Sequence, residues 1–165
     1  MRNKLIVIIL LLLSFLLHLY QHNISFFRIY QVDFFIIYSV LSVIFFKSFI
    51  PLFLSLLAGL LQDSFSGSII GINALSKFIL AYFCLLITNR IDIRIKGILL
   101  GLFMVACIID YAIIATIGKW FNLFVNVLPL HKLLLKFIIT SFAGYILYIV
   151  IKSFTETMHL EYEEY

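Results

Sequence analysis

The feature that most constrains this chain is its series of long apolar blocks separated by short polar segments. The blocks carry no polar face at a helical or a strand period, so they do not read as surface elements of a soluble domain. Hydrophobic residues make up 64% of the 165-residue chain and charged residues 12%. Ordinary globular domains have about 45–50% hydrophobic residues and about 25% charged residues. The pattern predicts an all-α integral membrane protein, because transmembrane β-strands would alternate over segments of about ten residues.

Six apolar stretches are candidate transmembrane spans. We expect them at residues 5–20, 33–46, 49–61, 69–88, 97–117 and 133–151, which makes residues 1–152 one six-helix transmembrane domain. Residues 153–165 then form an acidic tail. Spans two and three are short, giving roughly 20 Å of helix against a hydrocarbon core of about 30 Å. The alternative is one broken span over residues 34–61 with Lys47 near its centre.

The basic residues favour six spans over five. With six spans and a cytoplasmic N-terminus, seven Lys and Arg residues lie on the inner side and four on the outer side, as the positive-inside rule requires. With five spans, Lys47 would lie in lipid and Arg90, Arg94 and Lys96 would face outward. We therefore expect both termini in the cytoplasm. The chain has no basic run interleaved with aromatic residues, so it is not expected to bind nucleic acid.

Two charged residues lie deep within predicted spans. Lys77 and Asp110 each sit roughly 10–12 Å below the outer boundary, in spans four and five, so we predict that they form a buried pair. Asp33, Asp63 and Asn73 lie near the same side. Three explanations stand: a structural network, a contact with a partner protein, or a proton or solute pathway. The pathway is the weakest, because no ionisable residue is predicted deep in the inner half of any span.

Glycine pairs predict where helices pack closely, and the sequence carries no catalytic or metal-binding motif. Gly67 with Gly71, and Gly97 with Gly101, form small-xxx-small pairs that predict close helix packing. Cys84 and Cys107 stand alone in apolar blocks and read as small hydrophobic residues. The sequence contains no zinc, phosphate-loop, dinucleotide or Ser-His-Asp motif, so we expect no catalytic residues, no cofactor and no metal, and the chain is not predicted to be an enzyme.

The stretch "GLLQDSFSGSIIGINALSKFILAYF" resembles the signature of the rod shape-determining MreD family. The matching positions are Gly59, Asp63, Ser66, Gly67, Ser68, Gly71, Ala74, Leu75 and Tyr82. The stretch "VDFFIIY" also fits through Asp33 and Tyr38, although Val32 replaces the family's proline, and Asp110 in "IIDY" fits an Asp within span five. Lys77 is not part of the family pattern.

The resemblance implies a function. MreD-like proteins are inner-membrane scaffolds of the bacterial elongation complex that associate with MreC, MreB, RodA and its partner penicillin-binding protein, and so support peptidoglycan synthesis and rod shape. Their fold is similar to that of the substrate-binding subunits of energy-coupling-factor vitamin transporters. Such a subunit is the alternative function. Those subunits usually carry a small-xxx-small motif in their first span, whereas here Ser14 is the one small residue in that span.

Overall fold

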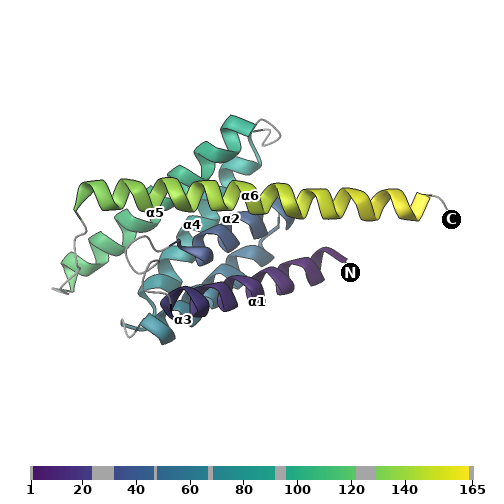
Figure 1. Cartoon of the computed structure of the whole chain (residues 1–165). Coiled ribbons are helices and arrows are strands. Elements are labelled where there is room, and N and C mark those ends of the chain that lie inside the picture. Colours follow the sequence, from purple (N-terminus) through teal and green to yellow (C-terminus); the bar gives the residue numbers. More distant parts are fainter. Residues whose placement is uncertain are drawn as a thin grey trace.

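The structure is a computed structural model that describes residues 2–23, 32–46, 48–66, 69–91, 96–121 and 129–163. These residues form helices and short turns, with no strand among them, which confirms the all-α prediction. The helices pack side by side, and α5 and α6 run in opposite directions along each other (Figure 1). Their bounds are α1 Arg2–Asn23, α2 Phe34–Phe46, α3 Ile50–Ser66, α4 Ile72–Thr88, α5 Lys96–Trp120 and α6 Leu130–Glu163.

Two of these helices contain segments that are long and apolar enough to cross a membrane. Gly97–Trp120 in α5 and Leu130–Ser153 in α6 are 24 residues each, with mean hydropathies of 2.5 and 2.1. Their most apolar windows are only 33% and 22% buried inside the molecule, so most of this apolar surface faces outward. The apolar helices Phe34–Phe46, Ile50–Phe65 and Ile72–Thr88 are shorter.

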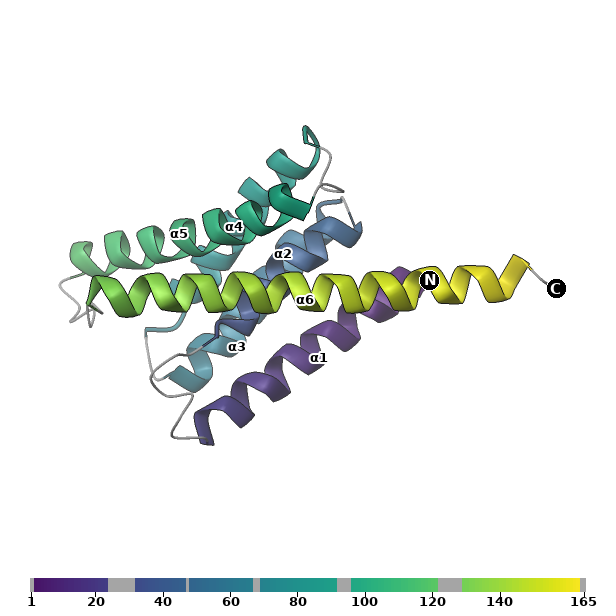
Figure 2. The same cartoon turned by 45° about the horizontal axis from the view of Figure 1, so that its top comes forward.

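Helix α2 lies at the centre of the bundle (Figures 1 and 2). It packs against all five other helices, and nine of its 13 residues, the run from Phe35 to Val43, are buried. Ser39 and Ser42 lie within this run, and each hydroxyl donates a hydrogen bond to a backbone carbonyl of the same helix, on Phe35 and Ser39. A short, almost wholly apolar helix is therefore buried because its neighbours enclose it on every side.

Helices α2 and α3 are separate and pack against each other, so residues 34–61 do not form one continuous helix. Lys47, between them, lies outside the described residues. Helix α3 continues five residues beyond the predicted span, so Gln62 and Asp63 are helical rather than in a loop. Helix α4 begins at Ile72 instead of 69, because Ile69 and Ile70 belong to the turn that precedes it.

The C-terminal segment continues a helix. Helix α6 runs without interruption to Glu163, through most of the residues 153–165 that the sequence suggested as a separate acidic tail. In both views its C-terminal part projects beyond the rest of the bundle (Figures 1 and 2). The sequence placed the boundary where hydropathy falls, but a helix can continue in water once a preceding segment has nucleated it.

Candidate functional site

The junction between α3 and α4 is built around one carboxylate. Asp63, in the last turns of α3, is 1% exposed. Its Oδ2 accepts hydrogen bonds from the backbone N–H groups of Gly71 (2.8 Å) and Ala74 (3.3 Å). Its Oδ1 accepts from the backbone N–H of Asn73 (3.2 Å) and from the Asn73 side-chain amide (2.8 Å). Asp63 therefore satisfies the first turn of α4 from a neighbouring helix, where the positive end of the helix dipole favours an anion.

Two glycines make this junction possible. Gly71 precedes α4 with a φ of 108°, a left-handed conformation that costs other residues roughly 1–2 kcal/mol. At Gly59 on α3, an added Cβ would lie 2.4–2.6 Å from backbone atoms of Asn73 and Ala74. Gly59 thus lets α3 and α4 approach to backbone contact, which brings Asp63 within reach of the α4 N-terminus.

The remaining positions of the signature differ in how far their side chains are exposed. Ala74 is buried, whereas Leu75 and Tyr82 are 48% and 45% exposed on the surface of α4. Gly67 and Ser68, and the side chain of Ser66, lie outside the described residues. The polar, glycine-rich stretch in this apolar chain is therefore the junction between two packed helices. Its carboxylate accepts hydrogen bonds from the backbone of the junction, and its glycines permit the turn and the close approach of the helices.

A cluster of buried charges lies next to this junction. The Lys77 Nζ on α4 is 2.8 Å from the Asp110 Oδ1 on α5 and 3.4 Å from the Asp33 Oδ2 at the start of α2. The exposed fractions of Lys77, Asp33 and Asp110 are 0%, 7% and 4%. Lys77 thus donates to two carboxylates on two other helices. We call Lys77, Asp33 and Asp110 the charged triad.

Neutral groups surround the triad and fix its geometry. The hydroxyl of Ser76 donates to the Asp110 Oδ1 at 2.6 Å, and the amide of Gln62 donates to the Asp33 Oδ2 at 3.4 Å. The other Asp33 oxygen caps α2 by accepting from the N–H groups of its first turns at 3.1 Å. The Asp33 N–H donates to the Thr140 hydroxyl on α6 at 3.4 Å. These contacts join five helices, α2 to α6, at one polar point.

The triad carries a net charge of −1, from one ammonium and two carboxylates. A buried charge is costly unless it is paired and hydrogen-bonded, so this arrangement strongly specifies how the helices face one another. The members of the triad bind each other and are at most 7% exposed, so they present little polar surface of their own.

The structure adds to the sequence hypothesis and corrects part of it. The sequence suggested that Lys77 meets Asp110, and the structure adds Asp33 as a second acceptor. The polar supports on α3, α4 and α6 were missed, because single Gln, Ser and Thr residues give no signal in sequence. Asn73, which was grouped with Lys77, instead binds Asp63.

The predicted glycine packing also needs correction. An added Cβ at Gly97 or Gly101 would meet nothing within 4 Å, so this pair does not bring α5 close to another helix of the chain. Gly71 shapes a turn, and Gly67 lies outside the described residues. The close approaches are made instead at Gly59 and at Gly144, where a Cβ would strike the ring of Phe103. Spacing identifies candidate glycines, but only the helix orientation decides which face inward.

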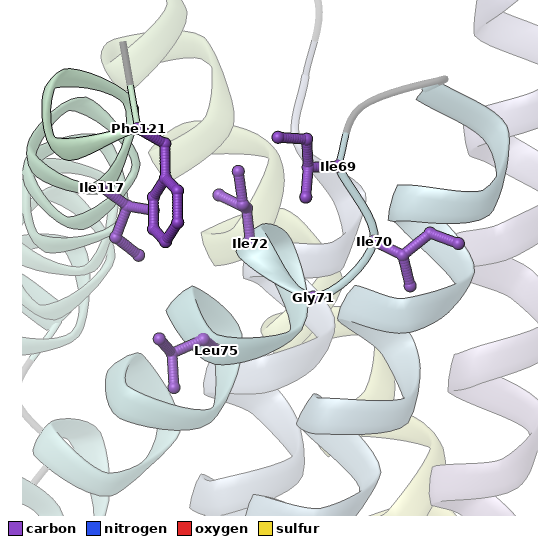
Figure 3. Close-up of a pocket in the computed structure, with 7 residues that line it drawn as sticks. All are labelled: Ile69, Ile70, Gly71, Ile72, Leu75, Ile117 and Phe121. Atoms are coloured by element: carbon purple, nitrogen blue, oxygen red, sulfur yellow. The ribbon is translucent and has the colours of Figure 1, made fainter. Parts of the chain in front are cut away.

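A shallow apolar groove lies beside the α3–α4 junction (Figure 3). Ile117, near the end of α5, and Phe121, directly after it, form one wall, and Ile72 and Leu75, from α4, face them. The turn residues Ile69, Ile70 and Gly71 complete the lining, and the groove encloses about 210 Å³.

The chain matches a known family over almost its whole length. The model of the family described as rod shape-determining protein MreD matches residues 2–158. Neither a curated protein nor a solved structure matches the chain significantly. The matched range includes the α3–α4 junction and every member of the charged triad.

Proposed function

Because the chain belongs to the MreD family of rod shape-determining proteins, we propose that it is a non-enzymatic scaffold of the bacterial elongation complex. In this role it binds MreC and works beside MreB, RodA and the elongation penicillin-binding protein. It thereby supports lateral-wall peptidoglycan synthesis and rod shape. The family consists of shape-determining membrane proteins. The proposal adds the specific partners with which this chain works.

The proposed setting is the bacterial inner membrane, crossed six times with both termini in the cytoplasm. The distribution of Lys and Arg supports this orientation. In it, the charged triad and the α3–α4 junction lie in the outer half of the bilayer, toward the cell wall. The short helix α2 then crosses as the enclosed centre of the bundle, whereas α5 and α6 turn much of their apolar surface toward lipid.

The observation that carries the scaffold proposal is the charged triad with its supports. A scaffold must hold a fixed surface for its partners, and a polar point joining five helices penalises any change in their packing. The same observation speaks against the transporter-subunit alternative. Among the described residues, the members of the charged triad are 7% exposed or less and bind each other, which leaves them few groups to offer a solute.

A pull-down tests the proposed partners. The tagged full chain is purified from its own host in a gentle detergent, and the bound proteins are identified by mass spectrometry against an untagged control strain. Enrichment of MreC, RodA or the elongation penicillin-binding protein is the expected result. Enrichment of paired ATPases with a large coupling subunit would contradict the scaffold and support the transporter subunit.

A depletion experiment tests the shape role independently of any partner. Loss of the chain is expected to turn rods into spheres, and re-expression is expected to restore rods. Cells that keep their rod shape and their lateral-wall incorporation of labelled peptidoglycan precursors after full depletion would refute the proposed function.

A further inference from the structure

The groove lies where a short helix meets a long one. Helix α4 has 17 residues, or about 25 Å of helix, whereas the hydrocarbon core is about 30 Å thick. The apolar segment of α5 has 24 residues, or about 36 Å, and reaches farther. If α5 spans the bilayer, the turn before α4 lies below the boundary that α5 reaches. This mismatch forms a notch in the lipid-facing surface, next to the end of α5.

The walls of the notch are apolar and open. Ile70 and Phe121 are 74% and 69% exposed, and Leu75, deeper in the groove, is 48% exposed. The Asp63 carboxylate binds the backbone N–H groups behind the turn, so the groove itself presents almost wholly hydrocarbon. An extended peptide in such a place would leave its own backbone groups unsatisfied. An acyl chain has no such groups, so the groove suits a lipid tail.

The exposed charges at this end of the bundle are basic. Among the described residues, Lys119 at the end of α5 and His131 and Lys132 at the start of α6 are exposed. The carboxylates described at the same end, Asp33, Asp63 and Asp110, are buried. Basic side chains at this end with no exposed carboxylate described beside them complement an anionic headgroup. Trp120, which is 86% exposed next to Phe121, suits the level of the headgroups.

We propose that this groove, lined by Ile69, Ile70, Ile72, Leu75, Ile117 and Phe121, binds the acyl chain of an anionic phospholipid. The exposed basic side chains at this end of the bundle, Lys119 and Lys132 among them, then attract its phosphate through the charge that they place near the headgroups. The lipid comes from the leaflet at the α3–α4 end of the bundle. Its role is to fill the notch that the short helix leaves, which would otherwise deform the bilayer. This inference does not depend on which proteins the scaffold binds.

The chain provides its own probe for this site, because Trp120 is its single tryptophan. The purified full chain is reconstituted in phosphatidylcholine vesicles that contain increasing amounts of brominated phosphatidylglycerol or brominated phosphatidylcholine. Bromine quenches indole fluorescence only at short range. Each nearby lysine contributes about 1 kcal/mol to the binding of anionic lipid, or about a fivefold preference. We therefore expect brominated phosphatidylglycerol to reach half-maximal quenching at a membrane fraction at least about fivefold lower than the fraction that brominated phosphatidylcholine requires.

Matched variants connect the preference to the proposed residues. Lys119→Gln with Lys132→Gln is expected to abolish the preference, whereas Lys152→Gln, which changes an exposed lysine near the other end of α6, preserves it. Leu75→Phe fills the groove and is expected to weaken quenching by both lipids, whereas Ile108→Phe, on another exposed face of α5, does not. Each protein is normalised to its fluorescence in unbrominated vesicles.

Two outcomes would overturn the inference. One is equal quenching of the unmodified chain by the two brominated lipids. The other is a phosphatidylglycerol preference that the paired lysine changes leave intact. Equal quenching together with protection of Trp120 by a co-purified protein would assign the groove to a protein partner instead.

Discussion

Replacing Lys77 by Met gives the sharpest test of the charged triad. Methionine has a similar length and an adaptable apolar chain, so the change removes the charge while filling most of the volume. It leaves Asp33 and Asp110 buried together without the ammonium that lies 3.4 Å and 2.8 Å from their oxygens. The triad then changes from a net charge of −1 to −2. We expect Lys77→Met to be among the most destabilising single changes in the chain.

The magnitude follows from the distances. At an effective dielectric constant of about 20, the two contacts contribute about 6 and about 5 kcal/mol of attraction. The desolvation of the ammonium, several kcal/mol per buried ion, offsets much of this. Removing one partner of a buried pair typically costs about 3–5 kcal/mol. For a chain of this size, that corresponds to a fall in Tm of about 6–20 °C.

Thermal melts of the purified chain in one detergent measure the effect. Lys132→Met is the matched control, because Lys132 is exposed at the start of α6 and should tolerate the same change within about 0.5 kcal/mol. The triple variant Lys77→Met, Asp33→Asn, Asp110→Asn removes all three charges and is expected to recover most of the loss. Asp33→Asn alone leaves a neutral Lys77–Asp110 pair and should cost less than Lys77→Met.

The reasoning would be refuted by either of two results. A Tm for Lys77→Met within about 2 °C of the unmodified chain would show that the ammonium contributes little. A triple variant no more stable than Lys77→Met would show that the loss does not come from uncompensated carboxylates.

Three further changes test the α3–α4 junction and the glycines, each by its Tm in the same detergent. Asp63→Ala removes four hydrogen bonds from a buried helix terminus and should cost about 2–3 kcal/mol; a loss under about 0.5 kcal/mol would mean that other groups cap α4. Gly59→Ala should cost about 1–3 kcal/mol, because the added methyl group forces α3 away from α4. Gly101→Ala, whose added methyl group faces open space, should be neutral or slightly stabilising. Equal effects of the two changes on Tm would contradict the packing described. Gly71→Ala should cost about 1–2 kcal/mol because of its positive φ, and an unchanged Tm would indicate that the turn relaxes to another conformation.

The family signature has a physical explanation in this chain. Asp63, Gly59 and Gly71 bring α3 and α4 into contact and satisfy the polar backbone of the turn between them. A turn near the hydrocarbon has no water to satisfy its N–H groups, so a carboxylate from the adjacent helix accepts their hydrogen bonds instead. The triad then places α5, α2 and α6 around this hairpin. The two polar features together fix a bundle whose apolar contacts alone would tolerate many orientations.

The sequence by itself determined the helical class of the protein and the approximate positions of its helices. Long apolar blocks leave few structures besides membrane-crossing helices, and the charges at their ends suggest an orientation. The depths of Lys77 and Asp110 were also enough to suggest their contact, because equal depth on adjacent antiparallel helices brings side chains to one level. The resemblance of residues 59–83 to a family signature likewise rests on the order of the residues alone.

Only the tertiary structure decided which faces of the helices meet. An apolar helix that is hydrophobic all round has no pattern to show which side is inside, so Gly59 and Gly144 could not be separated from Gly97 and Gly101. The second acceptor of Lys77, on α2, and the action of Asp63 on α4 depend on rotations about the helix axes. These rotations are set by the packing of five helices at once, and no local stretch of sequence encodes them.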